Sequence, residues 1–180
     1  LIIKDNDLIA ATSGRGFWIL DDIASIQQSA QGLDSMAFRI FNPKANYKFV
    51  LGGQGRGDVG KNPPAGVLID YHLPADFQKT DTLRMEIRDG NGDLIRSYSN
   101  QADEDFYSWV GGPVPAPVLS SVKGINRFNW DLRRAEVPGV DGVFIFGSPF
   151  GSTVGPGAYT ATLHYDSLQE VVDIQVLADP

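Results

Sequence analysis

One stretch of the sequence decides the fold: Asp81-Thr-Leu-Arg-Met-Glu-Ile-Arg-Asp-Gly-Asn-Gly-Asp-Leu-Ile-Arg-Ser-Tyr-Ser99. Leu83, Met85 and Ile87 alternate with charged residues, a period of two that is typical of a strand with one buried face. The residues Asp89-Gly-Asn-Gly-Asp93 tolerate positive φ angles, so the chain can reverse tightly there. The residues that follow predict the returning strand, although their alternation is poorer. Because such a hairpin cannot bury its apolar face alone, we expect a second sheet to cover it.

Similar patterns recur on both sides of this hairpin. Strands are predicted at residues 7–12, 16–20, 36–41, 47–51, 67–73, 124–132, 155–165 and 170–177. A short helix is predicted from Ile23 to Gln27, capped by Asp22. The sequence from Val67 to Leu177 therefore predicts about seven strands, which favours an all-β fold, an immunoglobulin-like antiparallel β-sandwich.

Aromatic residues fill several of these predicted strands. Phe128, Trp130 and Tyr159 are expected in the core. The apolar residues around Phe128 do not share one parity, which is compatible with a β-bulge or a strand that crosses between sheets. Residues 143–146 predict either a short strand or an aromatic plug in a loop.

Composition excludes several classes of function. The chain has 180 residues with 20 Gly and 11 Pro, a content of turn formers that suits β-structure. A net charge of −7 argues against a nucleic-acid partner, because phosphate binding needs concentrated Lys and Arg. The lack of Cys excludes disulfides and thiolate zinc sites. No apolar run approaches the roughly 20 residues of a membrane span, so no membrane partner is expected.

The best candidate for a binding site is an aromatic and acidic cluster in a predicted loop. It consists of Phe106, Tyr107 and Trp109 with Asp103, Glu104 and Asp105. Sugar-binding modules stack pyranose rings on exposed aromatic side chains and bind hydroxyl groups with carboxylates. The alternative is that Trp109 plugs one end of the sandwich or packs on a neighbouring domain.

Other polar groups are explained better by structure than by chemistry. Asp89, Asn91 and Asp93 have the spacing of calcium ligands, but Asn100 stands where a calcium loop has Glu, so a hairpin turn is favoured. His72 and His164 have no spacing that proposes a metal site. The acidic pair Asp21-Asp22 is interpreted as a turn and a helix cap, and no cofactor is predicted.

A glycine-rich run, residues 52–66, carries Arg56 and Lys61 and invites a phosphate-loop interpretation. It lacks the Gly-Lys-Ser/Thr ending, and Pro63-Pro64 prevents a helix from following. A flexible connector is therefore the better interpretation.

Parts of the sequence resemble a known family. The stretch Asp7-Leu-Ile-Ala-Ala-Thr-Ser-Gly-Arg-Gly-Phe-Trp-Ile-Leu-Asp-Asp22 resembles the last blade of bacterial BNR/sortilin-like β-propeller proteins, often catalogued as sialidase-like or glycosyl-hydrolase-like. Asn62-Pro-Pro-Ala-Gly-Val-Leu-Ile-Asp-Tyr71 resembles the start of their C-terminal domain. The patterns at residues 83–95, 126–132 and 155–160 are similar to that domain and to the Ig-like domain of flagellar hook-capping proteins. Together the resemblance covers most of residues 7–20 and 60–178.

The resemblance implies a division of the chain and a role. Residues 1–59 would hold the last propeller strands, a short helix and a linker, and residues 60–180 the Ig-like sandwich. The chain would be a non-catalytic accessory domain that braces or caps a propeller in a larger protein, located in the periplasm or outside the cell. Its partner would be the rest of its own polypeptide.

Two alternatives stay open. The first is a carbohydrate-binding module with a glycan as partner. The second is part of a sialidase-like glycoside hydrolase whose active site lies on the propeller. No Asp-box of the form Ser-x-Asp-x-Gly-x-x-Trp occurs, so no catalytic residue is carried over.

Overall fold

The computed structural model describes residues 1–29, 37–48, 64–78, 81–136, 139–144 and 146–179 of the chain. Regular structure in these residues is almost entirely β, with one helix, α1 (Ala24–Gln28). The strands are β1 (Ile2–Lys4), β2 (Asp7–Thr12), β3 (Gly16–Leu20), β4 (Arg39–Ile40), β5 (Asn46–Lys48), β6 (Val67–Leu73), β7 (Leu83–Asp89), β8 (Leu94–Ser99), β9 (Gly124–Trp130), β10 (Gly157–Tyr165) and β11 (Leu168–Ala178). Within the described residues, no helix has the length and apolar character that crossing a membrane requires.

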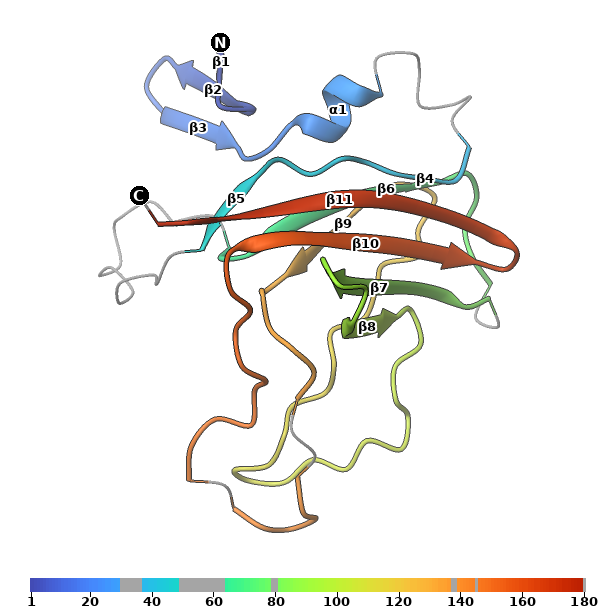
Figure 1. Cartoon of the computed structure of the whole chain (residues 1–180). Coiled ribbons are helices and arrows are strands. Elements are labelled where there is room, and N and C mark those ends of the chain that lie inside the picture. The colour runs from blue at the N-terminus through green and yellow to red at the C-terminus, as the bar shows by residue number, and fades with distance from the viewer. Residues whose placement is uncertain (30–36, 49–63, 79–80, 137–138, 145, 180) are drawn as a thin grey trace.

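The strands form three sheets (Figure 1). A five-stranded sheet has the order β5-β11-β10-β7-β8, and a three-stranded sheet has the order β4-β6-β9. These two sheets face one another as an all-β sandwich, and their inner side chains share one core. The third sheet, β1-β2-β3, lies beside the sandwich next to α1.

Two short strands from before residue 60 belong to the sandwich. β4 pairs with β6 in the smaller sheet, and β5 pairs in parallel with the end of β11. The sequence placed the sandwich in residues 60–180, whereas both of its sheets also contain strands from the preceding part of the chain. The sequence pattern predicted strands in this part of the chain but not their partners in the two sheets.

The central hairpin forms as predicted. Leu83, Met85 and Ile87 are fully buried, and Gly92 takes a positive φ of 85° in the turn. The poor alternation of β8 has a structural cause, because the pairing of β7 with β8 shifts register between Ile87 and Arg88. Such a bulge breaks the strict alternation of side chains between the two faces of a strand.

Aromatic contacts join the two sheets of the sandwich. The Tyr98 ring of β8 lies 4.5 Å from Phe128 of β9, and Trp130 of β9 lies 5.3 Å from Tyr159 of β10. Phe128, Trp130 and Tyr159 are all buried, which confirms their prediction as core residues. The close approach of Gly66 to the Trp130 carbonyl oxygen leaves no space for a Cβ atom at residue 66.

The uneven spacing of apolar residues along β9 is explained without a bulge. Its pairing with β6 is continuous from Val67–Trp130 to Leu73–Gly124. Ile125 points outward and is 37% exposed, while Asn126 takes the inward position and is buried. The Asn126 amide bonds the carbonyl oxygens of Val122 and Gly124, so its polar atoms are satisfied there.

Three local predictions need correction. Helix α1 has Ile23 rather than Asp22 at its N-cap, although the Asp22 carboxylate still accepts a hydrogen bond from the Ala24 N–H at 3.1 Å. Residues 143–144 form no strand, and no plug either, because Phe144 is 60% exposed. The strands predicted at 36–41 and 47–51 are present only as β4 and β5, and residues 36 and 49–51 lie outside the described part of the chain.

We expect replacement of Leu163 by Ala to lower the free energy of unfolding by about 2–5 kcal/mol, because this fully buried side chain in β10 would leave a cavity. Val171→Ala on the neighbouring strand is the control, since Val171 is 51% exposed and its loss should change stability by about 0.5 kcal/mol or less. Urea unfolding measures both. Equal effects of the two variants would contradict the position of the core.

Candidate functional site

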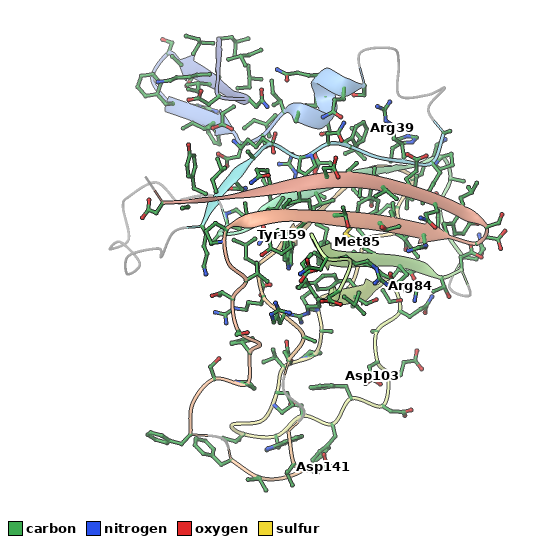
Figure 2. The ribbon with its side chains drawn as sticks, in the orientation of Figure 1. Arg39, Arg84, Met85, Asp103, Asp141 and Tyr159 are labelled. Atoms are coloured by element: carbon green, nitrogen blue, oxygen red, sulfur yellow. The ribbon has the colours of Figure 1, made fainter. Side chains whose placement is uncertain are left out.

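Two long loops carry the predicted aromatic and acidic cluster. They connect β8 to β9 and β9 to β10, and together they extend below β8, the edge strand of the larger sheet, away from the sheet of β1, β2 and β3 (Figure 1). Figure 2 shows Asp103 on the first loop and Asp141 on the second, both at a distance from the sandwich. We call the described residues 100–118 and 139–150 the loop lobe.

Trp109 joins the two loops of the lobe. Its indole Nε1 donates a hydrogen bond of 2.8 Å to the carbonyl oxygen of Val143. Gly112 and Gly139 lie so close to the ring that a Cβ atom on Gly112 would stand 2.5 Å from it, and one on Gly139 3.2 Å from it. Trp109 is half-buried by these contacts. Trp109 therefore packs between the two loops of the lobe, a position that the sequence analysis did not specify.

The rest of the cluster remains accessible. The Tyr107 ring stacks on Trp109 with centroids 5.6 Å apart and an angle of 26° between the planes, and Tyr107 is 62% exposed. Asp103, Glu104 and Asp105 are exposed, and Phe106 is half-buried. The structure thus brings together the two stacked rings, with the acidic side chains earlier on the same loop.

The sequence did not single out the other apolar residues of the lobe as a surface. Phe146 is fully exposed, Val110 is 85% exposed, and Phe144 is 60% exposed while it packs against Gly111. The signal that could have found them is the absence of Lys and Arg from residues 100–118 and 139–150, together with many aromatic residues. Such a segment has no core of its own to fill.

The weak metal candidate is a hairpin turn. The Asp89 carboxylate accepts hydrogen bonds from the N–H groups of Asn91 at 2.9 Å and Asp93 at 3.1 Å. One of its oxygens is thereby used in shaping the turn, as Asx turns do. Nowhere in the described residues do three acidic, His or Cys side chains stand in a group that could hold a metal ion.

The two histidines lie apart on different sheets. The Nδ1 atom of His72 in β6 is 3.1 Å from the Ala37 carbonyl oxygen, and His72 is buried. His164 in β10 lies 4.0 Å from the carboxylate of Glu86. Two arginines flank Glu86, and the hydrogen bond from Arg88 is the main reason that the pKa of Glu86 is lowered.

A polar network on the outer face of β6 was missed by the sequence analysis. The Arg127 guanidinium of β9 binds both oxygens of the Asp70 carboxylate, from Nε at 2.7 Å and Nη2 at 2.9 Å. The hydroxyl of Ser25 in α1 donates to the same carboxylate at 2.5 Å. The guanidinium also donates to the carbonyl oxygens of Asp21 at 2.9 Å and Asp22 at 2.6 Å. We call this set of residues the Asp70–Arg127 clamp.

The clamp attaches the segment between β3 and α1 to the sandwich. Asp70 and Ser25 are buried, so the Asp70 carboxylate and the Ser25 hydroxyl are largely shielded from solvent. Charge-assisted, bidentate pairs of this kind are among the stronger hydrogen bonds in proteins. The hydrogen bond to Asp70 is also the main reason that the pKa of Arg127 is raised.

A second set of bonds connects the sheet of β1, β2 and β3 to the same place. The Asp7 carboxylate at the start of β2 accepts from the Asp22 N–H at 2.9 Å and from Lys44 Nζ at 3.2 Å. The hydrogen bond from Asp22 is the main reason that the pKa of Asp7 is lowered. The Ile23 N–H donates to the Asn6 carbonyl oxygen at 2.7 Å.

The sheet of β1, β2 and β3 is apolar on both faces. Its register places one group of side chains on one face and a second group on the other, because residues directly paired in antiparallel strands point the same way. The first face carries Ile2, Ile9, Phe17 and Ile19, and the second carries Ile3, Leu8, Trp18 and Leu20. Phe17 is 77% exposed and Trp18 is 63% exposed. Neither face is covered by the described part of the chain.

We expect Arg127→Met to lower the free energy of unfolding by about 1–3 kcal/mol, because it leaves the buried Asp70 carboxylate without its guanidinium partner. Hydrogen exchange at the amides of Asp22 and Ile23 should become faster, since these residues lose their attachment to β9.

The matched control is Arg84→Met. Arg84 pairs with Glu86 at 3.1 Å, but its side chain is 51% exposed, so stability should change by about 0.5 kcal/mol or less. Unchanged amide exchange at Asp22 and Ile23 in the Arg127 variant would show that the clamp does not hold the N-terminal segment.

Comparison with known proteins identifies no relative of this chain. No protein-family model, curated protein or solved structure matches the chain. The resemblance to BNR/sortilin-like propeller proteins and to hook-capping proteins therefore stays a prediction.

Proposed function

We propose that the chain is a non-catalytic accessory domain that braces a β-propeller belonging to the same, longer polypeptide. The observation that carries this proposal is the sheet of β1, β2 and β3, which is apolar on both faces and exposed on both. Exposed apolar surface of this extent usually marks a binding interface. A partner that covers only one face would leave the other in water.

Because both faces of this sheet are apolar, a partner must cover both of them, and this restricts the kind of partner. In a β-sandwich each sheet buries one face, whereas in a propeller each blade is packed between two neighbouring blades. A small antiparallel sheet with apolar residues on both faces has the surface of such a blade. The order of the strands also fits, because β1, β2 and β3 follow one another both along the chain and across the sheet.

The Asp70–Arg127 clamp gives the bracing role a physical basis. A domain can support a neighbour only if the connection between them is stiff. Here the link from β3 to α1 is held by two charged groups, Asp7 and Arg127, that bind its main chain, and by Asp70 beneath it. The sandwich would therefore hold a propeller blade in a fixed orientation.

The strand order supports an immunoglobulin-like assignment of the sandwich within this proposal. A sheet of three strands faces one of five, and the pair formed by β5 and β11 is parallel while the other pairs are antiparallel. Immunoglobulin-like domains divide their strands between two facing sheets in a similar way. The exported location and the link to a glycoside hydrolase rest on the sequence resemblance alone.

Hydroxyl-radical footprinting tests the proposal. We expect Trp18 to be oxidised several-fold more slowly in the natural longer polypeptide than in residues 1–180, because neighbouring blades would cover it. Tyr107 is the internal control, since it has nearly the same exposure, 62% against 63% for Trp18, and lies on the loop lobe. Equal oxidation of Trp18 in both forms, or an upstream sequence without blade motifs, would contradict the proposal.

A second candidate function is carbohydrate binding by the loop lobe. It is favoured by the stacked pair of Tyr107 and Trp109, which leaves the Tyr107 ring accessible beside exposed carboxylates. Tyr107 would then be the stacking platform, and Trp109 would hold it in place. The glycoside hydrolase alternative would place its active site on propeller blades beyond this chain.

If the lobe binds glycans, Tyr107→Ala should weaken binding by about tenfold, because it removes the exposed aromatic face. Tyr47→Ala is the matched control, since Tyr47 is 48% exposed on β5, outside the lobe. A glycan array identifies ligands of the unaltered chain, and calorimetry then compares the variants. The absence of any glycan ligand on the array would reject this candidate.

A further inference from the structure

In the described part of the chain, the outer edge of β8 leaves the main chain of Ser97 unpaired. Asn100 N–H bonds the Leu83 carbonyl oxygen, so up to the register shift at Arg88 the main-chain groups of Arg96, Tyr98 and Asn100 face β7. The groups of Ser97 and Ser99 consequently face away from the sheet. The carbonyl oxygens of Ile95 and Ser99 accept hydrogen bonds from the N–H groups of Ala135 and Leu119, at 3.2 Å and 2.9 Å. Ser97, between them, has no such partner within the described residues.

The segment opposite Ser97 cannot close this gap by itself. Leu119 bonds Ser99, but Val118 before it follows Pro115-Ala116-Pro117, in which only Ala116 has an N–H group. Prolines beside a sheet edge prevent the formation of a further continuous strand. The gap therefore stays open between β8 and residue 116.

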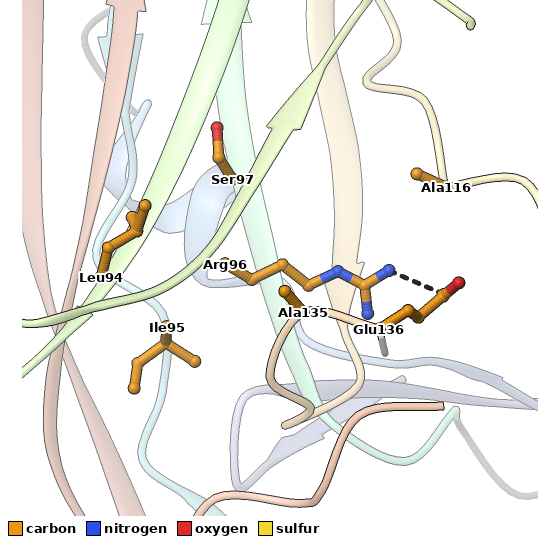
Figure 3. A pocket seen from close by; sticks show the side chains of 7 residues that line it. All are labelled: Leu94, Ile95, Arg96, Ser97, Ala116, Ala135 and Glu136. Carbon is orange, nitrogen blue, oxygen red and sulfur yellow. Dashed lines mark hydrogen bonds and ion pairs between the residues drawn. The ribbon is translucent and has the colours of Figure 1, made fainter. Parts of the chain in front are cut away.

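A pocket of about 410 Å³ occupies the gap (Figure 3). It is lined by Leu94, Ile95, Arg96, Ser97, Ala116, Ala135 and Glu136. It is an open hollow on the surface rather than an enclosed cavity. Its lining is mostly apolar, with polar groups only at a few places.

The pocket contains both donors and acceptors of hydrogen bonds. Arg96 Nη2 donates to Glu136 Oε1 at 3.1 Å, and the two side chains are 6% and 17% exposed. The guanidinium also lies 5.1 Å from the centre of the Tyr98 ring. Its Nε and Nη1 atoms and Glu136 Oε2 make no hydrogen bond within the described residues. Ser97 adds one main-chain donor and one acceptor.

We propose that this pocket binds one peptide group of an extended, uncharged segment of another protein, which bonds the main chain of Ser97 between the contacts that Leu119 and Ala135 make with β8. A peptide group carries one donor and one acceptor, and so it complements both Ser97 and the Arg96–Glu136 pair. A free carboxylate fits less well, because Glu136 already neutralises Arg96 and would repel a second anion. This inference does not depend on the proposed role in bracing a propeller.

Titration of the ¹⁵N-labelled chain with N-acetyl-Ala-Val-Ala-methylamide, followed by two-dimensional NMR, tests the proposal. We expect the Ser97 amide signal to shift downfield as its N–H gains an acceptor, with smaller shifts at Arg96 and Ala116. Binding should be insensitive to salt, because the peptide has no charge. Acetate at the same concentrations should not shift these signals.

Three variants test whether the main-chain groups of Ser97 carry the binding. Ser97→Pro removes the outward N–H without breaking a bond to β7, and should weaken binding by about tenfold. Ser97→Ala keeps the N–H and should bind like the unaltered chain. Ala116→Trp fills the pocket from the opposite side and should abolish binding even if the proline variant is unstable.

Several outcomes would overturn the inference. They are an unshifted Ser97 amide at saturating peptide, equal binding by the Ala116→Trp variant, or stronger shifts with acetate than with the peptide. The last result would identify a carboxylate site at Arg96 in place of a peptide site.

Discussion

The structure depends on the burial of β6 on both of its faces. Its odd-numbered residues from Val67 to Leu73 are completely buried in the core between the two sheets. On the opposite face, Asp70 and His72 are also buried: Ser25 of α1 donates to the Asp70 carboxylate, and the Ala37 carbonyl oxygen lies 3.1 Å from His72 Nδ1. One strand therefore has an apolar side that holds the sandwich together and a polar side that holds the N-terminal segment. The hydrophobic effect stabilises the apolar side without a preferred direction, whereas the hydrogen bonds of the polar side fix the direction of its contacts.

Much of the sandwich could be predicted from the sequence because the apolar residues of several strands recur at every second position. Leu83 to Ile87 and Tyr159 to Leu163 have this period and their apolar side chains are buried, although Glu86 and Thr162 on the opposite faces are buried as well. The pattern was less informative in β9, where Asn126 takes an inward position that a hydrophobic rule assigns to an apolar residue. The side-chain bonds that make this position tolerable depend on the turn before β9, which a strand pattern does not describe.

The Asp70–Arg127 clamp could not be predicted for a different reason. Its two charged residues are 57 positions apart and meet because β6 and β9 are neighbours in register. Nothing in the spacing of single charges reveals such a pair before the strands are aligned. The loop lobe was only partly predictable: the aromatic residues stood out, but the contact of Trp109 with Gly112 and Gly139 depends on how two distant loops meet.

The parallel pair of β5 and β11 has a mechanical consequence. β11 is the last strand of the described chain and lies between β5 and β10, while β5 follows the clamped N-terminal segment. Tension applied between the two ends of the polypeptide would slide β5 and β11 along each other, so their hydrogen bonds would be strained together instead of opening one after another. This short pair of strands would therefore be loaded in shear rather than peeled apart.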